Sequence, residues 1–171
     1  MKPRMTFRVG VLTCSTLGAQ GARVDESGAL IKELCRKWWK AEVAAYRVIP
    51  DDRRTIVRFL KNWCAQGGVD LILTTGGTGF SPSDVTPEAT RDVITREAPG
   101  LAELLRREGA WKTPLAWLSR GVAGLSGKVL IINLPGSPKA VRENLTALKN
   151  ILPHAMEIAS GRHEGKPAHP R

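Results

Sequence analysis

Cysteine, histidine and long apolar segments are scarce in this sequence, and each scarcity excludes a class of protein. The three cysteines, Cys14, Cys35 and Cys64, are odd in number and widely spaced, so they indicate neither a C-x-x-C zinc motif nor a disulfide framework. The three histidines are dispersed, which argues against a histidine metal centre. No apolar run approaches the length that spans a bilayer, and we therefore expect no membrane association.

The N-terminus lacks the pattern of a targeting segment. Residues 1–6 are basic, but Arg8 interrupts the apolar residues after them and no small-residue cleavage site appears. We therefore expect no signal peptide and a cytoplasmic location.

Acidic residues are outnumbered, and the formal net charge is +10. Such a charge is compatible with a nucleic-acid binder, an anionic substrate or a basic solvated surface. The lysines and arginines are scattered, and no basic run is interleaved with aromatic residues, as RNA-binding motifs require. We expect no nucleic-acid partner.

Short apolar runs alternate with segments of helical periodicity along the 171 residues. This alternation is typical of a parallel, doubly wound sheet that is covered by helices on both faces. We predict a single-domain three-layer α/β/α fold over residues 1–160 with a mostly parallel sheet, followed by a disordered basic tail at 161–171. The expected strands are residues 7–13, 42–48, 69–73, 121–125 and 128–134, and the expected helices include 29–40, 87–97 and 99–107.

A glycine-rich motif, Thr-Gly-Gly-Thr-Gly at residues 75–79, follows the strand expected at 69–73. Glycines permit positive φ and let backbone N–H groups turn toward a ligand, so this loop can form an anion site for phosphate. Asp84 follows closely, and an acid beside a phosphate loop indicates Mg²⁺ or catalysis. The motif is neither a Walker loop nor a Rossmann fingerprint, and the alternative interpretation is a tight turn.

Two further loops should meet this motif, because ligands of such folds lie beyond the carboxyl ends of the strands. Residues 14–25 and 50–52 are expected at the same edge, and residues 135–139 open another helix, whose N-terminus favours anions. Glycine amides, hydroxyls and the acids Asp51, Asp84 and Asp25 suit phosphoryl or nucleotidyl transfer. Asp51 or Asp52 is alternatively the N-cap of the next helix.

Residues 74–90 resemble the signature of the MogA/MoaB family, the molybdopterin-binding domain of molybdenum cofactor biosynthesis, which gephyrin and plant Cnx G domains share. The resemblance covers about Arg8 to Ser160. Further matching segments are Asp-Glu-Ser-Gly at 25–28, Ile-Pro-Asp-Asp at 49–52, Pro-Gly at 99–100, Leu-Ser-Arg at 118–120 and Asn-Leu-Pro-Gly-Ser-Pro-Lys at 133–139.

This resemblance implies a molybdopterin adenylyltransferase, which transfers AMP from Mg-ATP to the terminal phosphate of molybdopterin and releases pyrophosphate. It assigns catalysis and Mg²⁺ binding to Asp51 and Asp84. It also implies a homotrimer and a downstream molybdate-insertion protein as partner. The residues expected to bind substrate are Ser15, Asp25, Ser27, Thr75, Gly76, Gly77, Thr78, Gly79, Ser81, Pro135, Gly136, Ser137 and Lys139.

Two departures from the family pattern favour a second interpretation. Relatives often carry an acid and a base where this chain has Thr16 and Leu17, and many carry arginine where it has Ser83. Losing that arginine removes a phosphate or carboxylate partner near Asp84. The alternative function is therefore a MoaB-type pterin-binding protein with little or no adenylylation, and the choice between molybdenum and tungsten pathways stays open.

Tryptophan is over-represented, with five tryptophans against one tyrosine and three phenylalanines. Trp111 and Trp117 flank a segment too short to bury both, and tryptophan is enriched at subunit interfaces. Packing under the following strand is the alternative, but the family's trimeric habit favours a subunit contact. In the helix expected at 29–40, Trp38 is expected in the core and Trp39 at an edge or subunit contact.

Overall fold

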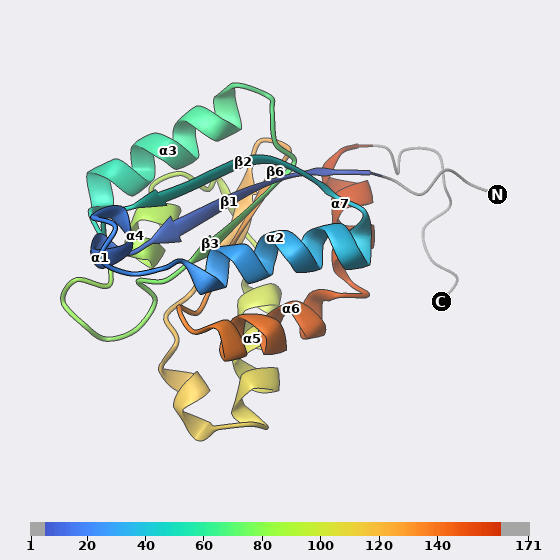
Figure 1. The fold of residues 1–171 in the computed structure, drawn as a ribbon. Helices are drawn as coiled ribbons and strands as arrows, with labels where there is room; N and C mark the ends of the chain where they lie inside the picture. The colour runs from blue at the N-terminus through green and yellow to red at the C-terminus, as the bar shows by residue number, and fades with distance from the viewer. Residues whose placement is uncertain (1–5, 162–171) are drawn as a thin grey trace.

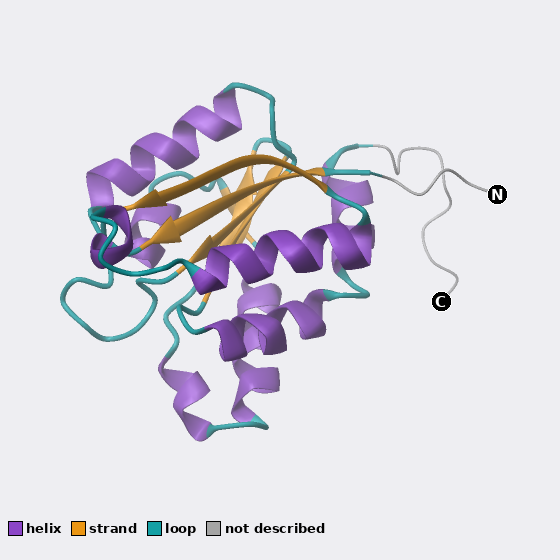
Figure 2. Ribbon diagram, in the orientation of Figure 1, coloured by secondary structure: helices purple, strands orange, loops and turns teal. Residues whose placement is uncertain are grey.

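The computed structural model describes residues 6–161 and places a twisted sheet between two layers of helices (Figures 1 and 2). The six strands of the described part are Arg8–Cys14 (β1), Glu42–Ile49 (β2), Leu71–Thr75 (β3), Arg96–Glu97 (β4), Ala123–Ser126 (β5) and Val129–Leu134 (β6). The helices are Thr16–Ala19 (α1), Glu26–Trp39 (α2), Arg53–Ala65 (α3), Thr86–Arg91 (α4), Pro99–Ala110 (α5), Pro138–Leu148 (α6) and Leu152–Ala159 (α7), with a 3₁₀ helix at Pro114–Leu118 (η1).

The strands are hydrogen-bonded in the order β2-β1-β3-β6-β5-β4. The four strands from β2 to β6 are parallel, and β5 and β4 are antiparallel to their neighbours. Every residue of β3 and β6 is buried, as expected of parallel strands that are covered on both faces. The predicted single-domain three-layer α/β/α fold with a mostly parallel sheet is confirmed. Residues 162–171 of the predicted tail lie outside the described residues.

Alternate residues of each strand serve two separate cores. Leu71 and Leu73 of β3 point to the layer that contains α2, α5, α6 and α7, whereas Ile72 points to the layer that contains α3 and α4. The same alternation in β6 sends Ile132 to the first core and Ile131 to the second. Both layers are visible on either side of the sheet in Figure 1.

The helix predicted over 87–97 is wrong in its second half, because α4 ends at Arg91 and residues 96–97 form the edge strand β4. The Thr95 N–H donates to the Leu125 carbonyl over 2.8 Å, and the Ala98 N–H donates to the Ala123 carbonyl over 2.8 Å. Pairing with β5 therefore satisfies backbone groups that a longer helix would have bonded internally.

The predicted roles of Trp38 and Trp39 are reversed. Trp39 shares a stripe of α2 with Ile31 and Cys35 at four-residue spacing, and it is 3% exposed. Its indole Nε1 donates to the Lys149 carbonyl over 2.9 Å. Trp38 is half-buried, and the Lys149 Nζ lies 5.1 Å from its ring centroid.

Among the described residues, no helix combines the length and the apolar character that crossing a membrane requires.

Candidate functional site

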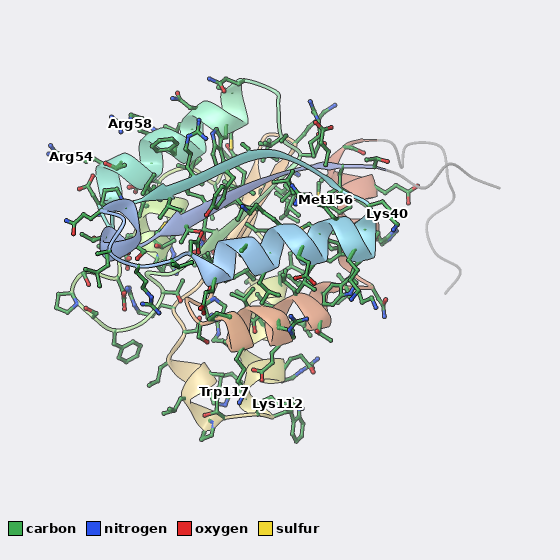
Figure 3. The ribbon with its side chains drawn as sticks, in the orientation of Figure 1. Lys40, Arg54, Arg58, Lys112, Trp117 and Met156 are labelled. Carbon is green, nitrogen blue, oxygen red and sulfur yellow. The ribbon has the colours of Figure 1, made fainter. Side chains whose placement is uncertain are left out.

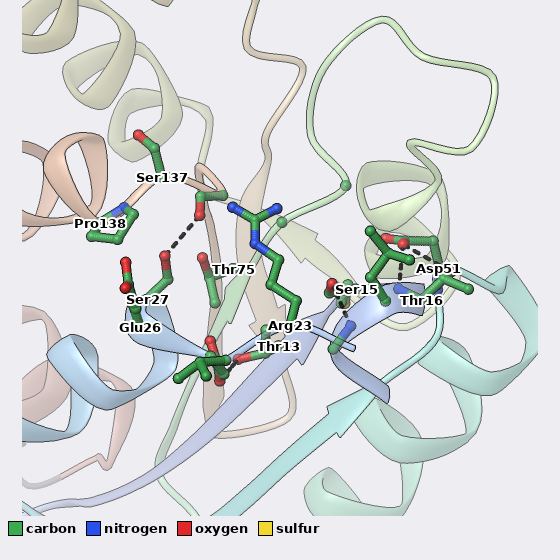
Figure 4. A pocket seen from close by; sticks show the side chains of 18 of the residues that line it. Thr13, Ser15, Thr16, Arg23, Glu26, Ser27, Asp51, Thr75, Ser137 and Pro138 are labelled. Carbon is green, nitrogen blue, oxygen red and sulfur yellow. Dashed lines mark hydrogen bonds between the residues drawn. The ribbon is translucent and has the colours of Figure 1, made fainter. Parts of the chain in front are cut away.

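A cavity of about 560 Å³ lies at the carboxyl ends of the parallel strands (Figure 4). It lies between the ends of β1 and β3, which are neighbours in the sheet. The chain leaves β1 toward β2 on one side and leaves β3 toward the opposite side, so the strand order reverses at this point. Such a switch point separates the loops on its two sides and is the usual ligand site of doubly wound sheets. The walls come from the loops after β1, β2, β3 and β6 and from the first turn of α2.

The glycine motif after β3 forms one wall and requires glycine at two positions. Gly76 has φ 92° and Gly77 has φ 65°, and residues other than glycine rarely adopt such positive φ values. A Cβ atom on Gly76 would lie 2.3 Å from the Cys14 carbonyl oxygen, and one on Gly77 would lie 2.4 Å from the Thr86 Oγ1. The backbone of this loop therefore lies so close to β1 and α4 that a residue with a Cβ atom would not fit at either position.

The Asp51 carboxylate belongs to the cavity, whereas its neighbour Asp52 builds α3. Asp52 Oδ1 accepts from the Thr55 N–H over 2.8 Å and is the N-cap. The alternative in which Asp51 caps this helix is wrong. Asp51 Oδ2 instead accepts from the Thr16 N–H over 2.8 Å and from the Thr16 hydroxyl over 3.1 Å. The two loops after β1 and β2 are thereby joined at the cavity (Figure 4).

The Asp84 carboxylate turns back over its own loop. Its Oδ2 accepts from the Ser81 N–H over 3.0 Å, and it lies 2.8 Å from the position of a Cβ atom on Gly79. Asp84 and Ser83 both line the cavity. Position 79 therefore requires glycine because the Asp84 carboxylate occupies the space of a Cβ atom, and not because its φ is positive.

The surroundings of Asp51 fit a metal ion that substrate helps to hold. The position of a Cβ atom on Gly77 lies 3.3 Å from Asp51 Oδ1 and 2.4 Å from Thr86 Oγ1. Thr86 Oγ1 is buried and has no hydrogen-bond partner among the described residues. Residues 6–161 contain no cluster of three or more His, Cys, Asp or Glu side chains that could hold a metal unaided. Two carboxylates on one cavity fit Mg²⁺, which is typically held by one or two carboxylates together with water and substrate phosphates.

Asp25 is fully engaged in holding the cavity floor. Its Oδ1 accepts from the Gly28 N–H over 2.8 Å and caps α2. Its Oδ2 accepts from the Thr13 hydroxyl over 2.6 Å and from the Tyr46 hydroxyl over 2.7 Å. Burial, together with the hydrogen bond to Asp25 and its negative charge, raises the pKa of Tyr46 to about 12. The carboxylate therefore orders the start of α2.

Two hydroxyls tie the last loop to the rest of the site. The Ser27 hydroxyl donates to the Gly136 carbonyl over 2.7 Å, and the Thr75 hydroxyl donates to the Pro135 carbonyl over 2.6 Å. Ser15 closes the first loop, because its Oγ accepts from the Gly18 N–H over 3.1 Å and caps α1.

The structure brings most of the predicted site residues to the cavity and leaves some behind it. Those that line the cavity are Ser15, Asp25, Ser27, Asp51, Thr75, Gly76, Gly77, Asp84, Gly136 and Ser137. The other predicted residues lie in the same loops or at the start of α6 without lining it, namely Thr78, Gly79, Ser81, Pro135 and Lys139.

Arg23 is the main cavity residue that sequence reasoning missed. It follows α1, and Figure 4 shows its side chain extending across the opening between Ser15 and Ser137. Among the described residues that line the cavity it is the one lysine or arginine. Nothing in the sequence distinguishes Arg23 from the other lysines and arginines of this basic chain.

The sequence matches the family described as "Probable molybdopterin binding domain" over residues 10–154. It is 38% identical over 159 residues to a molybdopterin adenylyltransferase of Helicobacter pylori, a match that covers 92% of this chain and 90% of that protein. It is 40% identical over 149 residues to the molybdenum cofactor synthesis protein cinnamon of Drosophila melanogaster. That match covers 87% of this chain but only 25% of cinnamon.

The fold is similar to a solved structure at high sequence identity. The crystal structure of the molybdopterin biosynthesis enzyme MoaB from Thermus thermophilus matches with a TM-score of 0.86 and 52% identity. The match covers 91% of this chain and 98% of that one.

Proposed function

The chain belongs to the MogA/MoaB family of molybdopterin-binding domains, and from this premise we propose that it is a molybdopterin adenylyltransferase. An oxygen of the terminal phosphate of molybdopterin bonds to the α-phosphorus of ATP, the bond from that phosphorus to the bridging oxygen of the β-phosphate breaks, and pyrophosphate leaves. The observation that carries the proposal is that Gly76, Gly77, Asp51 and Asp84 line one cavity.

The residues of the cavity suit a reaction in which positioning and charge neutralisation supply most of the catalysis. The backbone at Gly76 and Gly77 binds phosphate through N–H groups of the kind that form anion-binding nests. The Arg23 guanidinium supplies a positive charge at the opening, and guanidinium groups pair with phosphate in a bidentate manner. Arg23 thus provides the cation that Ser83 does not.

Asp51 and Asp84 would hold Mg²⁺, which when bound neutralises part of the negative charge of the polyphosphate. The chain itself orients both acids. The Thr16 N–H and hydroxyl fix Asp51, and the Ser81 N–H fixes Asp84.

The alternative function, pterin binding without efficient adenylylation, is favoured by the cavity positions of Ser83 and Leu17. These residues stand where many relatives carry charged side chains, and fewer charges in the cavity disfavour turnover. The two functions differ in one product, pyrophosphate.

The deciding experiment incubates the protein with molybdopterin and Mg-ATP and measures pyrophosphate and adenylylated pterin. We expect release by the wild type and none by Asp84→Ala. The matched control is Asp92→Ala, because Asp92 forms a surface ion pair with Arg53 outside the cavity. Binding of molybdopterin without pyrophosphate would establish the alternative, and wild-type turnover by Asp84→Ala would refute the role of Asp84.

The proposal extends to the assembly and the setting of the protein. Trp111 and Trp117 are 79% and 58% exposed in the single chain. Burying such aromatic side chains between subunits favours self-association, and we propose a homotrimer with a contact at η1. We place the reaction in the cytoplasm and its product with a molybdate-insertion protein. The chain spans a quarter of the length of cinnamon, so this longer relative carries additional sequence beside the region that matches.

A further inference from the structure

Arg120 connects the segment before β5 to both ends of the loop that carries Asp84. Its backbone N–H donates to the Thr78 carbonyl over 2.9 Å. Its side-chain Nε donates to the Gly79 carbonyl over 2.7 Å, and its Nη2 donates to the Asp84 carbonyl. Its Nη1 pairs with Glu88 on α4. One residue therefore bonds to the start of the loop, to its end and to the helix that follows.

Arg106 on α5 holds Arg120 in turn. Its Nη1 donates to the Ser119 carbonyl over 3.3 Å and to the Gly121 carbonyl over 3.0 Å. These two carbonyls flank Arg120 in the chain. The backbone at Arg120 is thereby fixed by a helix that belongs to the opposite layer of the fold from α4.

The loop between the two bonded ends is held by hydrogen bonds and not by apolar burial. Residues 80–83 are exposed, and Phe80 is 69% exposed. Within the loop, the Ser81 N–H donates to Asp84 Oδ2 and the Asp84 N–H donates to the Ser81 carbonyl over 2.9 Å. Because apolar burial does not hold this segment, its shape depends on these internal hydrogen bonds and on those that Arg120 makes at its ends.

The charge of Arg120 is balanced within the protein. Burial alone would raise the pKa of Glu88, but the hydrogen bond and positive charge of Arg120, together with a backbone hydrogen bond and the charge of Arg91, leave that pKa below its usual value. All three guanidinium nitrogens of Arg120 donate to protein oxygens, and Arg120 is not among the residues that line the cavity. Arg120 therefore orders the protein around it and is not placed to bind substrate.

We propose that Arg120 is a positioning residue for the adenylyl transfer, which fixes Asp84 relative to the phosphate-binding backbone at 76–79. The inference rests on the proposed function, because that function gives Asp84 its task at the metal. A planar guanidinium can bond to Gly79, Asp84 and Glu88 together, whereas a lysine ammonium at the same position is a single point charge.

The first test measures amide hydrogen exchange in the free protein and needs neither Mg²⁺ nor activity. In Arg120→Lys we expect the amides of Ser81 and Asp84 to exchange roughly tenfold faster, the equivalent of losing one charge-assisted hydrogen bond. The matched control is Arg96→Lys, since Arg96 also donates to a backbone carbonyl, that of Gly127 on the far edge of the sheet. The control should leave both amides unchanged.

The second test measures pyrophosphate release as a function of Mg²⁺ concentration. For Arg120→Lys we expect the half-maximal Mg²⁺ concentration to rise roughly tenfold, with kcat restored at saturating Mg²⁺, because a mobile Asp84 binds metal less tightly. Glu88→Gln, which keeps every bond from Arg120 to the loop carbonyls, should shift both readouts in the same direction by a smaller factor. If Arg120→Lys does not fold, both measurements are made on Glu88→Gln instead.

The outcomes separate the two proposals. Wild-type amide exchange in Arg120→Lys and Glu88→Gln would overturn the positioning role, as would a loss of kcat that no Mg²⁺ concentration restores. A wild-type protein that releases no pyrophosphate would overturn the proposed function alone, since the exchange rates of the Asp84 loop are measured without turnover.

Discussion

Asp51 and Asp52 are adjacent acids with different tasks. Asp52 faces the first turn of α3 and lowers the free energy of the folded state by satisfying the Thr55 N–H. Asp51 lines the cavity, where its contacts with Thr16 hold two loops together. Adjacent positions in the chain thus provide the N-cap of α3 and a carboxylate that lines the cavity.

Tyr46 provides a prediction about pH at the scale of one residue. Its hydroxyl donates to Asp25, and its pKa is raised from 10.0 to about 12. A folded pKa above the unfolded value means that the neutral tyrosine is preferred in the fold. The stabilisation is therefore complete below pH 10 and is lost as the pH rises toward 12.

Two measurements check this expectation for Tyr46. It is the only tyrosine in the chain, so tyrosinate absorbance reports its titration, and we expect a midpoint near 12. Tyr46→Phe should cost about 1 kcal/mol at neutral pH, because Asp25 loses one donor at a half-buried position. The variant should also lack the tyrosine-dependent loss of stability in alkali. A midpoint at the ordinary value would contradict the hydrogen bond to Asp25.

At the scale of elements, the loop after β3 differs from the loop before it. Gly67, between α3 and β3, has φ 68°, close to the 65° of Gly77. A Cβ atom on Gly67 would meet nothing within 4 Å, whereas one on Gly77 would collide with Thr86 Oγ1 at 2.4 Å. The same backbone conformation is thus a simple turn in one loop and a close approach between elements in the other.

The two glycines form a matched pair for mutagenesis. Gly67→Ala carries only the penalty of a left-handed alanine, about 1–2 kcal/mol, and should keep full pyrophosphate release. Gly77→Ala should lose more stability than Gly67→Ala and should also lose turnover, because α4 must shift away from the new methyl group. Urea unfolding and the pyrophosphate assay check both effects. Equal losses of stability in the two variants would show that contact with Thr86 is unimportant.

At the scale of the whole molecule, one end of the fold presents apolar side chains to solvent. η1 and the residues before it carry Trp111, Leu115, Trp117 and Leu118, which are between 47% and 79% exposed. Figure 3 labels Trp117 at this end of the molecule. The expected alternative, burial of both tryptophans under the next strand, is wrong.

This surface leads to a prediction about assembly. Light scattering at micromolar concentration should give three times the chain mass of 18.6 kDa. Replacing Trp111 and Trp117 together by alanine should weaken the trimer, because such side chains carry a large share of interface energy. Ile158→Ala, which removes an exposed apolar side chain from α7, is the control. A monomer mass for the wild type would refute the trimer, and an unaffected trimer in the double variant would refute the placement.

The amino-acid sequence by itself determined the class of fold and indicated the loops that line the cavity. Strands buried on both faces are nearly continuous in their apolar residues, so β1, β3 and β6 stand out as short runs such as Leu-Ile-Leu at 71–73. Glycines at 76 and 77 indicate left-handed backbone, and the order of strands and helices sends their loops to one edge. These properties are local or periodic, and they can be read without knowing which segments meet.

Only the tertiary structure decided the features that depend on long-range partners. Residues 96–97 became a strand because β5 offered backbone groups to pair with. Trp39 packs in the core, where the Lys149 carbonyl accepts the hydrogen bond of its indole N–H. Arg23 and Arg120 look alike in a chain with 26 lysines and arginines, yet one lines the cavity and the other bonds to the loop that carries Asp84. The physical reason is that an arginine's task is set by the oxygens around it, and in this protein those oxygens come from segments far away in the sequence.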